Sequence, residues 1–166
     1  ADSYLNSTST YLNRYSTLIG PYPYKKFDLI ENFWDTGFGM PSFTLLGSNI
    51  IRLPFIINTS YPHEILHDWW GNSVYVDYDR GNWCEGITAY MADHLMSEMN
   101  GLGDTYRRDT LQKYTDYVTP ANDFPLNKFL SSVIIVSCVS PFGTFFTTVN
   151  SPSFSTSKSN LLMVQT

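Results

Sequence analysis

Apolar residues recur at helical spacing in two long segments of the chain. Between residues 3 and 19, tyrosine and leucine side chains form an approximate stripe that ends at Gly20-Pro21. A second stripe of Ile, Ala, Met and Leu side chains runs from Glu85 to about Asn100. A further helix is expected from about Asp104 to Tyr117, since Pro120 follows it.

Shorter segments have the pattern of strands and turns. Phe27-Asp-Leu-Ile-Glu31 and Asn49-Ile-Ile-Arg-Leu53 are predicted strands that flank a glycine-rich loop. Ser73-Val-Tyr-Val-Asp77 alternates like a short strand, and Tyr78-Asp-Arg-Gly81 is a predicted turn. We therefore expect a few short strands among the helices.

Charge divides the chain into two parts. The 166 residues, 43% of them hydrophobic and 16% aromatic, can bury one core and make at most one domain. Of the 25 charged residues (10 basic and 15 acidic), all but Lys158 lie in residues 1–130. We predict a domain at residues 1–130 and a Ser/Thr-rich tail at 131–166 that is poorly ordered or atypical. The tail is either natural or a truncated or out-of-frame end, and the second interpretation is favoured.

Composition also limits the partners. A net charge of −5 and a pI near 4.9 argue against a nucleic-acid partner. No segment approaches the roughly 18–20 apolar residues that span a bilayer. The start at Ala1 is expected for a mature form or an excised fragment. The two cysteines leave the compartment open, with an extracytoplasmic location slightly favoured, and the oligomeric state is not predicted.

The clearest chemical signal is His63-Glu64-x-x-His67. Residues four apart lie on one face of an α-helix, about 6 Å apart along its axis, so both imidazoles can reach one zinc ion at roughly 2.0–2.1 Å. Glu64 is turned around the helix from the histidines, where a general base could act on a zinc-bound water. Since two of the three histidines lie in this motif, we predict one Zn2+ site here.

Signals for a helix surround the motif. Ser60 is the predicted N-cap, and Pro62 falls in the first turn, where a missing N–H costs nothing. Gly71 and Asn72 supply a C-terminal stop. The motif is therefore expected on a helix that begins near residue 60 and ends before Gly71.

A catalytic zinc needs a third protein ligand and an open position for water. Glu85 is the favoured ligand, because the second helix could return it to the two histidines. Cys84 is the rival, but adjacent helical positions point about 100° apart, so only one of the pair can face the metal. Thiolates are more usual in closed structural sites, and we interpret Cys84 as a buried small apolar residue. The alternative for Glu85 is a solvated carboxylate in the first turn of a helix.

These motifs resemble a known group of enzymes. His63-Glu-x-x-His67-x-Trp-Trp-Gly-Asn72, followed by Trp83-x-Glu85-Gly86, is similar to the zinc-binding core of the gluzincin metallopeptidases of the aminopeptidase N type, and most of all to their bacterial relatives. The likeness extends from Gly37-Phe-Gly-Met-Pro-Ser-Phe-Thr-Leu-Leu46 to about Leu130, so the chain resembles a catalytic-core fragment.

The resemblance implies both a fold and a site. The fold would be α+β: a thermolysin-like zincin catalytic domain, mainly helical with a small mixed sheet. His63, His67 and Glu85 would bind the zinc, and Glu64 would be the catalytic base. Gly39 and Met40 lie where the family binds its substrate.

Three departures from the family bear on activity. Seventeen residues separate His67 from Glu85, one fewer than in the family, which the turn at 78–81 can absorb. The family's Gly-Ala-Met-Glu-Asn segment binds the substrate's amino terminus through its Glu, whereas the matching Gly39-Met40-Pro41-Ser42 has no acid. The family also stabilises the oxyanion with a downstream Tyr hydroxyl, but all twelve tyrosines here lie at or before Tyr117.

The expected function is zinc-dependent hydrolysis of peptide bonds in a peptide or protein substrate, with Glu64 as general base for a metal-activated water. The first alternative is a zinc-binding but catalytically silent module. An all-structural domain without metal is the second. Side-chain preference and the choice between exo- and endo-cleavage do not follow from the sequence.

Overall fold

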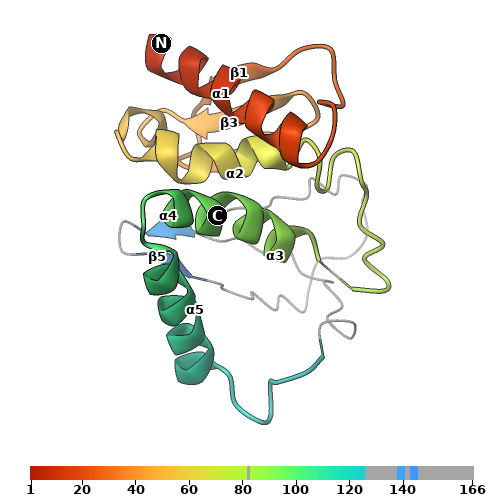
Figure 1. Ribbon diagram of the computed structural model, residues 1–166, viewed down its shortest axis with the longest axis vertical. Coiled ribbons are helices and arrows are strands. Elements are labelled where there is room, and N and C mark those ends of the chain that lie inside the picture. Colours follow the sequence, from red (N-terminus) through yellow and green to blue (C-terminus); the bar gives the residue numbers. More distant parts are fainter. Residues whose placement is uncertain (82, 126–137, 141–142, 146–166) are drawn as a thin grey trace.

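The computed structural model describes residues 1–81, 83–125, 138–140 and 143–145 (Figure 1). The fold is α+β, as predicted, and it is mainly helical with a small mixed sheet. The elements in chain order are α1 (Asp2–Leu18), β1 (Asp28–Asn32), β2 (Gly37–Met40), β3 (Phe43–Gly47), the 3-10 turns η1 (Ile50–Arg52) and η2 (Ile56–Asn58), α2 (Ser60–Leu66), α3 (Cys84–Ala89), the π-helical turn η3 (Tyr90–His94), α4 (Leu95–Met99), α5 (Gly103–Tyr117), β4 (Cys138–Ser140) and β5 (Gly143–Phe145).

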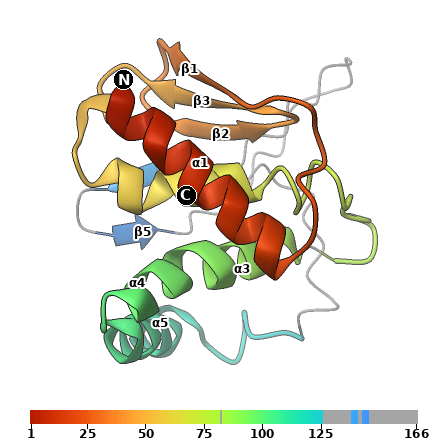
Figure 2. The ribbon, with the colours of Figure 1, turned by 45° about the horizontal axis from the view of Figure 1, so that its top comes forward.

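Helix α2 occupies the middle of the molecule. Figure 1 shows it between the sheet and the continuous helical segment α3–η3–α4, and Figure 2 shows α1 crossing it. The sheet has the order β1-β3-β2, with β1 parallel and β2 antiparallel to β3. Strand β2 is thus an edge strand, and it packs on α2.

The hydrophobic core surrounds α2. Tyr61, Ile65 and Leu66 of α2 are fully buried members of it. Tyr61 makes edge-to-face contacts with Tyr4 and Tyr11 of α1, at 5.0 and 6.4 Å between ring centroids. The other core residues are Tyr15, Leu46, Ile56, Trp69, Ala92 and Met96. Elements α1, β3, η2 and η3 all pack on α2 and contribute residues to this core, so contacts hold α2 from several sides.

The predicted helices are confirmed, and α2 begins near residue 60 as expected, but Ser60 is not its N-cap and the α-helix ends before the predicted stop at Gly71 and Asn72. Thr59 occupies the N-cap position without a side-chain cap bond, and Ser60 is the first helical residue. The α-helix ends at Leu66, because the next amides turn back to nearer carbonyls: Asp68 N–H donates to Ile65 at 3.0 Å, and Trp69 N–H donates to Leu66 at 3.0 Å.

The predicted strand at 49–53 is wrong. Residues 50–52 form a 3-10 turn instead, closed by the Leu53 N–H donating to Ile50 O at 3.0 Å. The Asn49 side chain donates to the Asp35 carboxylate, which holds the segment against the loop between β1 and β2. The segment predicted as a glycine-rich loop instead forms the hairpin β2–β3, while the strand expected at 27–31 is present as β1.

The strand predicted at 73–77 is also wrong. The segment makes a single bridge, between Trp70 and Val74, because it folds into a tight loop. In that loop Val74 N–H donates to Trp69 O at 2.8 Å, and Gly71 N–H donates to Val74 O at 3.0 Å. Gly71 has a φ of 103°, which glycine adopts without the steric penalty of a side chain.

The predicted tail lies mostly outside the described residues. Within it, β4 and β5 pair antiparallel, and the predicted domain boundary at residue 130 falls on residues that the structure does not describe. None of the helices in the described part of the chain is both long and apolar enough to cross a membrane.

Candidate metal centre

Three side chains predicted as zinc ligands converge between α2 and α3. Nε2 of His63 lies 3.4 Å from one Glu85 oxygen, and Nε2 of His67 lies 3.4 Å from the other. The three ligand atoms all lie within 4.8 Å of one another. Ligands placed tetrahedrally at roughly 2.0–2.1 Å from a zinc are separated by about 3.4 Å. These three side chains could therefore hold one metal ion between them.

The donor atoms are buried and otherwise unsatisfied. Among the residues that the structure describes, Nε2 of His63, Nε2 of His67 and Oε1 of Glu85 are buried side-chain atoms without a hydrogen-bond partner. Buried polar atoms nearly always have a partner, because removing them from water without one is unfavourable. Two imidazole nitrogens and one carboxylate form a donor set that zinc accepts.

Each histidine is oriented by its other ring nitrogen. Nδ1 of His63 lies 2.9 Å from a carboxylate oxygen of Asp93, and Nδ1 of His67 lies 3.0 Å from the carbonyl oxygen of Trp70. Because both partners are acceptors, Nδ1 carries a proton in each ring, and Nε2 is the nitrogen that faces Glu85. Metal-binding histidines are usually oriented by such contacts.

The local sequence explains how these residues meet. His63 lies on α2 and His67 at its C-cap position, which preserves the one-turn spacing of the motif. Glu85 lies in the first turn of α3, and Asp93 lies in the π-helical turn η3 of the same helical segment. One helical segment thus supplies both the carboxylate that faces Nε2 and the carboxylate that orients His63.

The side chains of Cys84 and Glu85, the two alternative ligands, face different nitrogens of the His67 ring. Cys84 Sγ lies 3.6 Å from Nδ1 of His67 and 3.2 Å from Trp70 O, whereas Glu85 faces the Nε2 side. Burial, together with the charge of Glu85, raises the pKa of the Cys84 thiol to about 12. Cys84 is buried, as predicted, and lies outside the group of potential ligand atoms.

Glu64 is buried beside the centre without belonging to the ligand group. It is 1% exposed, and within the described part of the chain neither carboxylate oxygen has a hydrogen-bond partner. A Cβ atom on Gly37 would lie 2.8 Å from Glu64 Oε1, so β2 packs directly on this side chain. Burial raises the pKa of Glu64 to about 8, although His63 opposes the shift.

Burial and neighbouring charges shift the pKa values of the three cluster residues in different directions. Burial opposes a charge on His63, but Asp93 and Glu85 outweigh it and raise its pKa to about 10. Burial lowers the pKa of His67, whereas the histidines lower that of Glu85 despite its burial. A divalent cation must therefore displace a proton from His63, and its positive charge would take over the role of that proton.

The predicted substrate-binding residues Gly39 and Met40 lie on β2. A Cβ atom on Gly39 would lie 2.7 Å from both the Glu64 backbone oxygen and His67 Cβ. The sequence did not predict that Asp93 orients His63. This contact joins residues 30 positions apart, so no local pattern indicated it.

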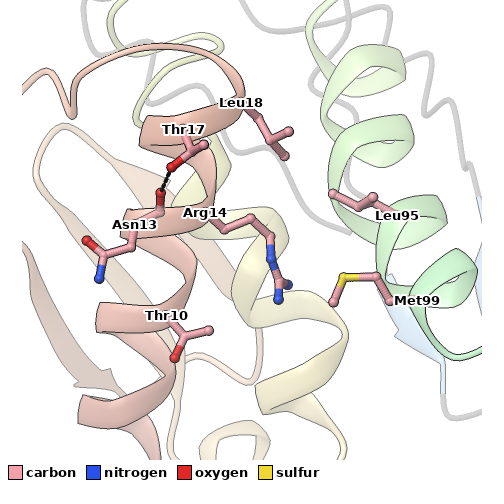
Figure 3. A pocket seen from close by; sticks show the side chains of 7 residues that line it. All are labelled: Thr10, Asn13, Arg14, Thr17, Leu18, Leu95 and Met99. Carbon is pink, nitrogen blue, oxygen red and sulfur yellow. Dashed lines mark hydrogen bonds between the residues drawn. The ribbon is translucent and has the colours of Figure 1, made fainter.

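A separate groove lies between α1 and α4 (Figure 3). Arg14 extends from α1 into it, contacting Met96 Sδ at 3.5 Å. The groove lining holds one cation and no acid, so it does not have the chemistry of a metal site. It is lined by Thr10, Asn13, Arg14, Thr17, Leu18, Leu95 and Met99.

Comparisons with protein-family models, with curated proteins and with solved structures give no match for this chain.

Proposed function

We propose that the protein is a zinc-dependent peptidase of the gluzincin type with a thermolysin-like catalytic domain. One observation carries the proposal: the free Nε2 atoms of His63 and His67 and the Glu85 carboxylate converge within 4.8 Å. The aminopeptidase N-like sequence around these residues supports the same assignment. His63, His67 and Glu85 would hold one zinc ion.

The chemistry assigns a distinct role to Glu64. A bound zinc supplies Lewis acidity, which acidifies a water molecule and polarises a peptide carbonyl. Glu64 accepts the proton of the attacking water and passes it to the leaving amine. It is buried and adjoins the proposed ligand His63 in the chain, which suits a group that acts on a metal-activated water. Asp93 holds the His63 ring in place through Nδ1.

Two departures from the family shape the expected activity. No acid stands at Pro41 or Ser42 to bind a substrate amine, so cleavage should not depend on a free amino terminus. No tyrosine follows Tyr117, and loss of one oxyanion donor typically lowers turnover by about 10²–10³-fold. Slow cleavage of both free and acetylated peptides is therefore expected.

The second candidate is a zinc-binding module without catalytic activity. The missing downstream tyrosine favours it, because a site can hold metal without stabilising the oxyanion. Turnover of a peptide library by zinc-loaded protein separates this candidate from the peptidase. Metal content separates both of them from a purely structural domain.

The first prediction concerns zinc itself. Protein purified without added metal should contain one zinc per chain, and His67→Ala should lose it. His94→Gln is the matched control, because His94 lies outside the cluster and contacts Arg107 at 2.6 Å. Elemental analysis of the three proteins measures the zinc bound per chain. Equal zinc in the wild type and in His67→Ala would refute the assignment.

A second arm of the same experiment tests the general base. Glu64→Gln should retain the zinc and lose peptide hydrolysis, because an amide cannot accept the proton. Glu98→Gln, at an exposed site, controls for the loss of a carboxylate. Loss of zinc from Glu64→Gln would instead make Glu64 a ligand or a determinant of the fold.

A further inference from the structure

The turn between β2 and β3 contains a backbone conformation that requires support. Ser42 has a φ of 71°, in the left-handed region that residues with a side chain rarely adopt. Pro41 precedes it, and proline followed by a residue of positive φ is typical of a type II turn. Glycine is the usual residue at the second of these positions. With serine there, contacts from elsewhere must stabilise the turn.

Asp68, in the segment that follows α2, provides such a contact. Its Oδ1 accepts the backbone N–H of Ser42 at 2.8 Å, and its Oδ2 accepts the hydroxyl of Tyr22 at 3.0 Å. Asp68 is 1% exposed, and no Lys or Arg pairs with it in the described part of the chain. A buried carboxylate without a cation is unfavourable, so these two hydrogen bonds are its main compensation.

Strand β2, which leads into this turn, packs directly on Glu64, the proposed general base. Gly37 and Gly39 are alternate residues of β2, so they share the face of the strand that meets Glu64. A Cβ atom at either position would come within 2.8 Å of a Glu64 atom. Any movement of β2 therefore changes the space available to the Glu64 carboxylate and to a substrate beside it.

A second polar contact joins the same two parts of the molecule. Asn72 Nδ2 donates to the Gly39 carbonyl oxygen at 3.1 Å. Asp68 and Asn72 both follow His67 within a few residues, so both contacts link the segment that carries a ligand to the hairpin beside the base. Asp68 acts at the turn and Asn72 acts on the strand itself.

We propose that Asp68 is a positioning residue that fixes the β2–β3 turn to the metal-binding segment and thereby sets the position of β2 over Glu64. Its catalytic consequence rests on the proposed peptidase function. The anchoring of the strand does not, because it follows from the two hydrogen bonds of Asp68. The two parts can therefore be tested separately.

The experiment compares zinc-loaded wild type, Asp68→Ala, Asp68→Asn and Tyr22→Phe by hydrogen exchange of residues 37–43. Asp68→Ala should exchange at least about tenfold faster there, while α1 keeps wild-type protection. Asp68→Asn should restore slow exchange, because its amide oxygen still accepts the Ser42 N–H and its NH₂ can donate to the Tyr22 oxygen. Tyr22→Phe retains the Ser42 contact and should stay close to the wild type.

Zinc content and kinetics complete the test. Asp68→Ala should retain its zinc, and its kcat should fall on the order of 10–100-fold with a smaller change in KM, as for a displaced reacting group. Asp68→Asn should recover most of the activity. Unchanged exchange at 37–43, faster exchange throughout the protein, or an Asp68→Asn variant as impaired as Asp68→Ala would each overturn the proposal. A wild type without zinc or turnover would refute the peptidase assignment, and the exchange comparison would still decide the anchoring.

Discussion

Helices α2 and α5 obtain their stability in opposite ways. All seven residues of α2 are buried, whereas Gly103 is the buried residue of the fifteen in α5. Figure 1 shows α2 between two layers, while α5 extends from the end of α4. The predicted zinc-binding motif lies on the shorter helix and at its C-cap.

This difference shows which contacts fix the positions of the side chains in the candidate site. A helix of seven residues is too short to be stable in water by itself, so α2 exists through its tertiary contacts. Helix α5 depends more on local pairs, such as Arg107 with Asp104 and Gln112 with Asp116. The same contacts that stabilise α2 also fix His63 and Glu64, because those residues are part of the packed interior. Stability and geometry of the site should therefore respond together to changes around α2.

The largest effect is expected from truncating a buried side chain of α2. Leu66→Ala should lower the free energy of unfolding by about 2–5 kcal/mol, since Leu66 is 0% exposed and its removal leaves a cavity. Leu111→Ala on α5 should change it by less than about 0.5 kcal/mol, because Leu111 is 67% exposed. Urea unfolding of both variants measures the difference. Similar losses would mean that α5 packs far more extensively than its exposure indicates.

The same contrast explains which elements could be predicted from the sequence. Residues 103–117 and the motif on α2 have local signals, namely their spacing and the prolines and glycines that flank them. The β2–β3 hairpin was missed because Gly37 and Gly39 indicate a loop in isolation. In the folded protein they are required for the close approach of β2 to Glu64.

The contacts of the candidate site also differ in whether the sequence could predict them. The pairing of His63 with His67 follows from one helical turn, so the sequence predicted it. The contact of Asp93 with His63 spans 30 residues and depends on how the helices pack. Likewise, the contact of Asp68 with Ser42 depends on a turn that forms only when the hairpin does. Roles that depend on tertiary packing have no local signature in one sequence.

Two glycines, one in the packed strand β2 and one at an open position of α3, allow a similar comparison for the backbone. Gly39→Ala places a Cβ atom 2.7 Å from the Glu64 backbone oxygen, so β2 must shift, at a cost of about 1–3 kcal/mol. Gly86→Ala on α3 meets no atom within 4 Å, and it should stabilise the helix by about 0.5–1 kcal/mol. Thermal unfolding and zinc content measure both effects. A Gly39→Ala protein with wild-type stability and zinc would show that β2 has more freedom than the close packing implies.

The smallest effect is expected only at alkaline pH, and it contrasts a tyrosine on each helix. Burial raises the pKa of Tyr61 on α2 from 10.0 to about 12, although its contact with Thr8 opposes the shift. A group whose pKa is higher in the folded state contributes stability that is complete below pH 10 and is lost as the pH rises towards 12. The unfolded chain releases this proton first, which favours unfolding in that window.

Replacing this tyrosine should therefore flatten the pH dependence of stability. Between pH 10 and 12, the wild type should lose roughly 1–2 kcal/mol more than Tyr61→Phe, after allowance for water that reaches the ring. Tyr117→Phe on α5 should lose as much as the wild type, because Tyr117 is 65% exposed. Urea unfolding at pH 9, 10, 11 and 12 provides the measurement. If Tyr117→Phe flattened the curve as much as Tyr61→Phe, the burial of Tyr61 would not be the source of the pH dependence, and the contrast between α2 and α5 would not hold at alkaline pH.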